Sequence, residues 1–214
     1  MIIPKLHYIS QGNSPKEHIE NIQKACTSGV ELVQLNLKNI SNKKYLKWAK
    51  EAQKITVHFQ TRLIINGNYE IAKTIKADGV YLEQMDTCPT IVRKFLYSWQ
   101  LIGVYANTLQ NCKDLINKEV DYICLGPYNS ETTEKNTPIN LGLNGYTAII
   151  DELKTKTPII GIKGITTNNV SEILETGISG VAVSRAITKD FNSIRLFNEL
   201  LNASSTKEQR YTFE

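Results

Sequence analysis

Short apolar runs alternate with stretches of helical periodicity along nearly the whole of this 214-residue chain. The runs lack the polar alternation of a half-exposed strand, so they predict strands that are buried on both faces. Between the runs, apolar residues recur at the spacing that gives a helix one buried face. The predicted strands are 5–10, 32–35, 62–65, 79–82, 101–105, 122–125, 159–162 and 180–183. The predicted helices are 15–27, a long helix after Ser41, 69–76, 89–97, 108–118, 145–154, 170–176 and 191–201.

The stretch 157–187 shows the repeating unit clearly, as a strand, a turn, a helix and a second strand. Gly164 lies in the turn after the first strand, and Asn168 or Asn169 is suited to cap the helix that follows. Small residues gather again at Ser184, after the second strand. A barrel of strand–helix units builds a phosphate site from backbone amides after its last two strands. The alternative is an ordinary turn in which the glycine serves only the backbone conformation.

About eight strand–helix units predict an α/β fold, namely a closed TIM (βα)₈ barrel, over an open doubly wound sheet. We expect residues 1–202 to form this barrel as one domain and the polar residues 203–214 to be a disordered tail. The connection 126–143 is much longer than an ordinary loop of this fold. In a barrel the functional side chains lie at the carboxyl ends of the strands. Besides the long connection, that mouth receives Asn36, Lys38, Asn66, Gln84, Asp86, Tyr105, Asn107, Lys163, Gly164 and Ser184.

Charge, apolar run length and cysteine spacing exclude several classes of function. The formal net charge is only +4, and lysines are spread along the helices, so the dense basic stripe of a nucleic-acid binder is missing. No apolar run has the length needed to cross a bilayer, and the start of the chain lacks a signal-peptide pattern. We therefore expect a soluble cytoplasmic protein with no membrane partner. Four cysteines without metal-site spacing are expected to be reduced structural thiols, at Cys26, Cys88, Cys112 and Cys124.

The strand-end motifs, taken together and in order, resemble one family from Leu6 to about Leu201. No single motif is specific, whereas the ordered set is. They are Val33-Gln34-Leu35-x-x-Lys38, Leu63-Ile64-Ile65-Asn66, Asp78-Gly79-Val80-x-Leu82-x-Gln84-x-Asp86, Ile102-Gly103-Val104, Asp121-Tyr122-Ile123-x-Leu125-Gly126-Pro127, Gly164-Ile165 and Gly180-Val181-Ala182-Val183-Ser184. This set is similar to thiamine phosphate synthase and to its relatives, the thiazole tautomerase-like proteins. The resemblance implies a TIM barrel that forms a homo-oligomer.

The resemblance also implies a reaction. The synthase joins hydroxymethylpyrimidine diphosphate to thiazole phosphate and releases pyrophosphate, so phosphorylated pyrimidine and thiazole ligands and Mg²⁺ are expected. By the same resemblance, Lys38 and Lys135 are the expected catalytic residues and Asp86 is the expected metal ligand. Substrate or phosphate contacts are expected from Gln34, Asn36, Asn66, Gln84, Tyr105, Thr132, Thr133, Lys163, Gly164, Val183 and Ser184.

Two departures from the family pattern weaken the expected pyrophosphate and magnesium site. Asn36 stands where the family has an arginine, and an amide does not replace a bidentate guanidinium. Gly67 stands where the family's Asn-Asp pair supplies a magnesium carboxylate. Asp86 therefore remains as one carboxylate where two are expected.

Three further departures follow along the chain. Tyr105 replaces a serine that binds pyrophosphate, and Glu131 and Glu134 replace a threonine and the lysine of the family's Thr-x-Thr-Lys loop. Lys135 lies one residue later, and a shift of the loop would bring it to the lysine position. Lys163 replaces the first glycine of a Gly-Gly-Ile turn, where its side chain either crowds the phosphate or reaches it as a cation.

Three functions stay open on this sequence. One is a divergent synthase of weak activity, and another is an inactive relative that binds a thiazole or pyrimidine phosphate or a partner. The third is a different small-molecule enzyme that uses Tyr105, Glu131, Glu134 and Lys163. The tautomerase reaction fits less well, because Asn107 stands where that branch has its histidine.

Overall fold

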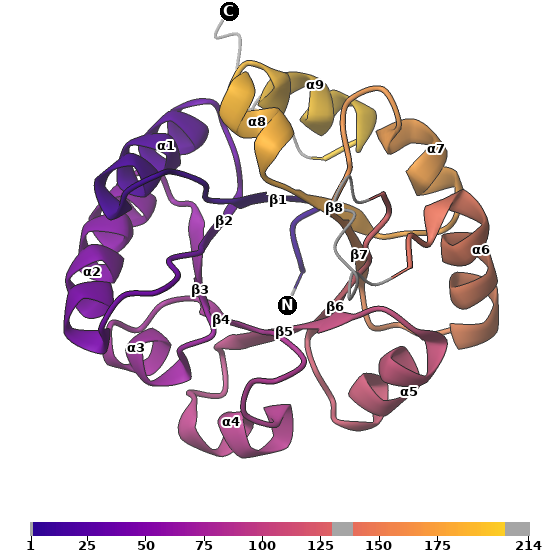
Figure 1. Cartoon of the computed structure of the whole chain (residues 1–214), viewed down its shortest axis with the longest axis horizontal. Helices are drawn as coiled ribbons and strands as arrows, with labels where there is room; N and C mark the ends of the chain where they lie inside the picture. Colours follow the sequence, from indigo (N-terminus) through magenta and orange to yellow (C-terminus); the bar gives the residue numbers. More distant parts are fainter. Residues whose placement is uncertain (1, 130–138, 204–214) are drawn as a thin grey trace, which may run out of the picture.

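The computed structural model describes residues 2–129 and 139–203, and their strands close into a parallel barrel in the order β1-β2-β3-β4-β5-β6-β7-β8. Figure 1 shows the helices as a ring around the strands, which is the TIM (βα)₈ fold that the periodicity predicts. The strands are β1 (Leu6–Ile9), β2 (Leu32–Leu35), β3 (Arg62–Asn66), β4 (Gly79–Leu82), β5 (Leu101–Ala106), β6 (Tyr122–Leu125), β7 (Ile159–Ile162) and β8 (Gly180–Val183). The helices are α1 (Pro15–Thr27), α2 (Asn42–His58), α3 (Tyr69–Thr74), α4 (Pro89–Phe95), α5 (Leu109–Asn117), α6 (Gly142–Leu153), α7 (Val170–Glu175), α8 (Arg185–Lys189) and α9 (Ser193–Leu200).

Side chains on the strands supply two apolar layers. One layer packs against the helices, and the other, which includes Ile64, Tyr81 and Tyr122, forms a separate cluster that we place inside the barrel. Tyr122 fits there because its strand neighbour is Gly103, where an added Cβ would lie 2.0 Å from the Tyr122 ring. The barrel interior is therefore a packed core, and ligands have access only at its ends.

All the predicted strands and helices are present, and their boundaries lie within three residues of those predicted. The bounds of β2, β4, β6, β7, β8 and α1 are those predicted, and α6 begins three residues early, at Gly142. Helix α8 is absent from the prediction, because one turn of helix has too few apolar positions to show a period. Asn169 occupies the predicted cap position of α7, but its side chain makes no cap bond to the helix, and its Oδ1 accepts instead from Thr166 N at 2.9 Å.

The ends of the long connection after β6 lie on the turn after β7. Tyr128 N donates to Ile162 O at 3.0 Å, and Asn129 N donates to Lys163 O at 3.2 Å. Residues 130–138 between these ends lie outside the described part of the chain, and with them Thr132, Thr133 and Lys135. Among the described residues, none of the helices is both long and apolar enough to cross a membrane.

Candidate functional site

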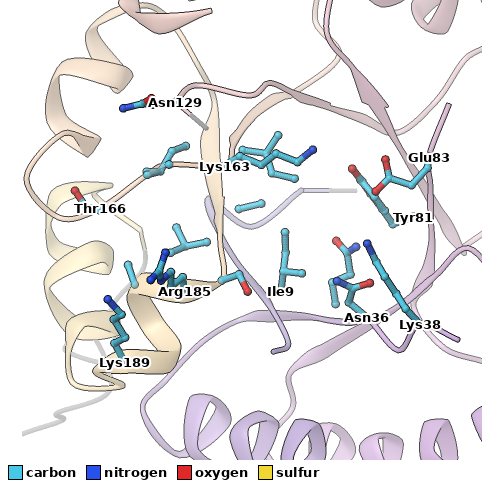
Figure 2. Close-up of a pocket in the computed structure, with 18 residues that line it drawn as sticks. Ile9, Asn36, Lys38, Tyr81, Glu83, Asn129, Lys163, Thr166, Arg185 and Lys189 are labelled. Atoms are coloured by element: carbon cyan, nitrogen blue, oxygen red, sulfur yellow. The ribbon is translucent and has the colours of Figure 1, made fainter. Parts of the chain in front are cut away.

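A cavity of about 890 Å³ opens at the carboxyl ends of β1, β2, β4, β7 and β8 (Figure 2). This is the mouth at which barrel enzymes carry their functional residues. Seven of the residues singled out from the sequence line it, namely Gln34, Asn36, Lys38, Lys163, Gly164, Val183 and Ser184. The other lining residues are Ile9, Tyr81, Glu83, Asn129, Ile162, Ile165, Thr166, Ala182, Arg185, Ala186 and Lys189.

One end of the cavity is made by the turns after β7 and β8. Gly164 adopts φ +80°, and the Asn169 side chain donates to Gly164 O at 3.0 Å while it accepts from Thr166 N, so two polar contacts hold the turn. Ser184 O accepts hydrogen bonds from Thr188 N and Thr188 Oγ1, at 2.9 and 3.1 Å. These turns present backbone close to the cavity, together with the cations Arg185 and Lys189. Such an end suits a phosphate group.

A row of three amide side chains lies toward the opposite end. Gln34 Nε2 donates to Asn66 Oδ1 at 3.1 Å, and Asn66 Nδ2 donates to Asn36 Oδ1 at 2.8 Å. Asn36 is in turn held through its backbone N–H, which donates to Ser10 Oγ at 3.0 Å. The row is well ordered but uncharged, so Lys38 beside it is the cation that the second strand contributes to the cavity.

The corner where the family pattern places magnesium does not offer a carboxylate pair. Asp86 Oδ2 accepts from Glu83 N at 2.8 Å and so closes a turn after β4. A Cβ added at Gly67 would lie 3.7 Å from that same Asp86 oxygen, so an aspartate at 67 would extend toward it. The described residues contain no cluster of three or more histidine, cysteine or acidic groups. The residues present therefore do not fit Mg²⁺ in the way that the resemblance implies.

Glu83 is a charged lining residue that the sequence reasoning missed. Partial desolvation by the surrounding protein raises the pKa of the Glu83 carboxylate. The charges of Lys163 and Lys38 act to lower this pKa, and the charge of Asp86 acts to raise it. In Figure 2 the carboxylate faces the ends of both lysine side chains. Its place directly after β4 was the available signal, because strand-end residues reach the mouth of a barrel.

Lys163 and Tyr105 meet at the centre of the mouth. The Lys163 amine lies 4.8 Å from the centroid of the Tyr105 ring, within the range of a cation–π contact. Tyr105 is buried and donates its hydroxyl to Gly126 O at 2.7 Å. Burial, with a smaller contribution from Glu83, raises the pKa of Tyr105 to about 12, so the phenol keeps its proton. Tyr105 thus acts as a fixed support for the Lys163 ammonium.

Five residues singled out from the sequence lie near the mouth without lining the cavity: Asn66, Gln84, Asp86, Tyr105 and Asn107. Asn66 bridges two lining amides, and Tyr105 supports Lys163. Gln84 donates to Asn107 Oδ1 and Asn111 Oδ1, at 3.0 and 3.2 Å. Gln84 therefore links the segments that follow β4 and β5, and it does not line the cavity.

Comparison with known proteins gives one consistent family. A sequence model described as thiamine monophosphate synthase matches residues 6–187. The chain is 38% identical to thiamine-phosphate synthase of Flavobacterium psychrophilum over 92% of this chain and 97% of that protein. It is 36% identical to the enzyme of the same name from Flavobacterium johnsoniae, over 94% and 97%. Thiamine phosphate pyrophosphorylase of Pyrococcus furiosus has the same fold, with a TM-score of 0.78, 23% identity and coverage of 92% and 96%. The chain therefore belongs to the thiamine monophosphate synthase family.

Proposed function

We propose that the chain is a thiamine-phosphate synthase that joins hydroxymethylpyrimidine diphosphate to thiazole phosphate and releases pyrophosphate. The observation that carries the proposal is one cavity with cationic and polar groups at each end. Lys38 and the amide row lie at one end, and the turns at Gly164 and Ser184 lie at the other. The diphosphate leaves from one substrate while the phosphate of the other stays in place, so the reaction needs two anion sites in one cavity.

The chemistry needs no general base from the protein. The bond between the pyrimidine methylene carbon and the diphosphate oxygen breaks, and its electron pair leaves with pyrophosphate. The thiazole nitrogen then attacks the methylene carbon with its lone pair. In our proposal Gln34, Asn36 and Asn66 orient the pyrimidine diphosphate, and Gly164, Val183 and Ser184 hold the thiazole phosphate. Lys38 stabilises the leaving charge, together with Lys135 from the loop outside the described residues.

Two positions of this site support a low rate of thiamine phosphate synthesis. Asn36 is neutral, and the magnesium corner has Asp86 without a second carboxylate at Gly67. Loss of one transition-state charge partner commonly lowers a rate by about 10²–10³. We therefore propose weak activity, and we propose no step that depends on Mg²⁺. An inactive relative that binds a thiazole or pyrimidine phosphate is the second candidate, which these two positions favour.

The testing experiment compares the natural chain with an Asn36→Arg, Gly67→Asp, Glu134→Lys variant, following thiamine phosphate. An aspartate fits at 67 because its Cβ makes an ordinary contact and aspartate tolerates the left-handed φ of +70° found there. We expect slow turnover by the natural chain and at least about tenfold faster turnover by the variant.

A Gly29→Asp variant is the matched control, since Gly29 has φ +88° and lies outside the cavity. Its turnover should equal that of the natural chain. Turnover by the triple variant alone would support the inactive relative, and turnover by neither protein would contradict the synthase proposal. We also propose that the protein works in the cytoplasm as a homo-oligomer, and light scattering coupled to gel filtration tests the oligomer.

A further inference from the structure

The side chain of Lys163 points away from the phosphate turn that its own backbone helps to form. Its carbonyl accepts from Asn129 N, and its neighbour Gly164 forms the turn. The side chain nevertheless runs across the mouth toward Glu83 and Lys38, on the side opposite Thr166 and Arg185 (Figure 2). The phosphate end is therefore left open, and the cation lies toward the end where the diphosphate would lie in the proposed reaction.

The backbone of Lys163 is strained in a way that glycine would avoid. Its φ is +66°, in the left-handed region that disfavours residues with a Cβ. Strained positions of this kind occur preferentially where the side chain serves a site. Lys76 and Lys154 share the feature, with φ +53° and +42°, but they follow the ends of α3 and α6 outside the cavity. These two lysines can therefore serve as controls, because their backbones are strained in the same way but they do not line the cavity.

Contact with the Tyr105 ring stabilises the direction of the Lys163 side chain. The amine lies 4.8 Å from the ring centroid, and the ring is fixed by the bond from Tyr105 Oη to Gly126 O. A flexible lysine is thereby kept near one place in the mouth. Lys38 enters the mouth from β2, and both ammonium groups act on the carboxylate of Glu83. Two cations thus face one another across a single competing carboxylate.

We propose that Lys163 is a catalytic residue of this chain, which with Lys38 binds the diphosphate leaving group in place of a metal held by two carboxylates. The inference rests on the proposed function, because that function supplies the diphosphate. As the carbon–oxygen bond breaks, its electron pair stays on the pyrophosphate oxygen, and the ammonium groups stabilise that charge by hydrogen bonds without losing a proton. Glu83 competes for the same cations and is displaced when pyrophosphate binds.

The test is calorimetric binding of inorganic pyrophosphate to the full chain, in EDTA and then in Mg²⁺. Lys163→Gly should lower the affinity by at least about tenfold, because it removes a charged hydrogen-bond donor. Lys163→Arg should keep the affinity within a few-fold of the natural chain, because the charge is retained. Lys154→Gly makes the same backbone change outside the cavity and should leave the affinity unchanged. Binding should persist in EDTA.

The Glu83→Gln variant should change pyrophosphate affinity in the opposite direction. Removal of the competing carboxylate should raise pyrophosphate affinity several-fold, and the rise should be smaller in a Glu83→Gln, Lys163→Gly double variant, where Lys38 is the remaining cation on which Glu83 acts. Equal affinity in the natural chain and Lys163→Gly would overturn the inference. Binding that vanishes in EDTA and returns with Mg²⁺ would also overturn it.

Turnover separates this inference from the proposed function. If the natural chain makes thiamine phosphate and Lys163→Gly is equally fast, the inference fails while the synthase proposal stands. If pyrophosphate binds through Lys163 but no thiamine phosphate forms, the synthase proposal fails and the diphosphate site stands without that reaction. A rate that falls by about 10²–10³ in Lys163→Gly, with Lys154→Gly unaffected, supports both.

Discussion

At the scale of single residues, two tyrosine hydroxyls in the barrel have no hydrogen-bond partner within residues 2–129 and 139–203. They belong to Tyr81 and Tyr122, the partners of Gly103 on the neighbouring strands β4 and β6. Tyr146 has a satisfied hydroxyl, which donates to Leu125 O at 2.9 Å and accepts from Ile162 N at 3.2 Å. Burial of a polar group without a partner opposes folding, so these hydroxyls differ in their effect on stability.

Tyr122→Phe is expected to leave the free energy of unfolding unchanged or to raise it by up to about 1–3 kcal/mol, because an unpaired buried hydroxyl is removed. Tyr146→Phe is the matched control and should lower it by about 1–3 kcal/mol, because Ile162 N and Leu125 O lose their partner. Urea unfolding at neutral pH measures both. A loss in Tyr122→Phe as large as that in Tyr146→Phe would show that the Tyr122 hydroxyl has a partner.

At the scale of elements, the turn after β7 and the connection after β6 depend on each other. Their backbones meet at Gly164, where an added Cβ would lie 1.9 Å from Asn129 O. The bond from Asn129 N to Lys163 O joins the same two segments. No side chain fits at Gly164 unless one of them moves. The glycine therefore serves close approach as well as its φ of +80°.

Gly164→Ala is expected to lower the free energy of unfolding by more than about 2 kcal/mol and to weaken thiazole phosphate binding, because backbone strain and a clash with Asn129 add together. Gly29→Ala tests strain alone, since φ is +88° there and nothing lies within 4 Å of the added Cβ. It should cost only about 1–2 kcal/mol and leave thiazole phosphate binding unchanged. Thermal unfolding and calorimetry measure the two effects, and equal losses in the two variants would argue against the close approach.

The helices and strands also show which elements the local sequence pattern can predict. Strands such as β7 are predictable because each residue of the run Ile159–Ile162 is buried, and a continuous apolar run in the chain reflects that burial directly. Helix α8 is too short for a helical period, and Asn169 is drawn from its cap into the turn at Thr166 and Gly164. At Asn169, local hydrogen bonds to the preceding turn replace the cap bond to the helix.

At the scale of the whole molecule, a histidine is buried where the barrel closes. His7 pairs with Leu32 of β2 and Ala182 of β8, and its Nε2 lies 3.0 Å from Pro4 O. Its ring meets Tyr122 edge to face, with 5.2 Å between ring centroids. Burial lowers the pKa of His7 from 6.5 to about 4, Pro4 acts to raise it, and Arg62 acts to lower it further. The imidazole is therefore neutral in the folded protein at neutral pH.

We expect the free energy of unfolding to fall as the pH decreases from about 6.5 to about 4. In this window the unfolded chain binds a proton at His7 that the folded chain does not, so the loss approaches about 3 kcal/mol. Above pH 6.5 this contribution is fully present. Urea unfolding at several pH values measures it, with His7→Gln as the control that removes the titration. His18, whose pKa is also lowered by burial, leaves the control a smaller slope of the same sign.

The candidate site was only partly predictable. Strand ends locate Lys38, Gly164 and Ser184 at one mouth, because a closed parallel barrel places all carboxyl ends together. Glu83 and Arg185 also line the cavity, and sequence reasoning missed them, since Glu83 stands at an unspecified position of a family motif and Arg185 follows the last motif. Gln84 and Tyr105 lie beside the cavity instead, held by hydrogen bonds to neighbours that no sequence spacing reveals.

The sequence by itself determined the alternation of strands and helices, the closed barrel and the neutral residues Asn36 and Gly67 at positions where the family carries charge. Such features follow from local periodicity and from the identity of each side chain. Only the tertiary structure decided that the Lys163 side chain leaves the phosphate turn and points toward Glu83 and Lys38. That direction depends on a left-handed backbone at 163 and on the Tyr105 ring beneath its amine. Both arise from packing between strands distant in the chain, and packing leaves no pattern along it.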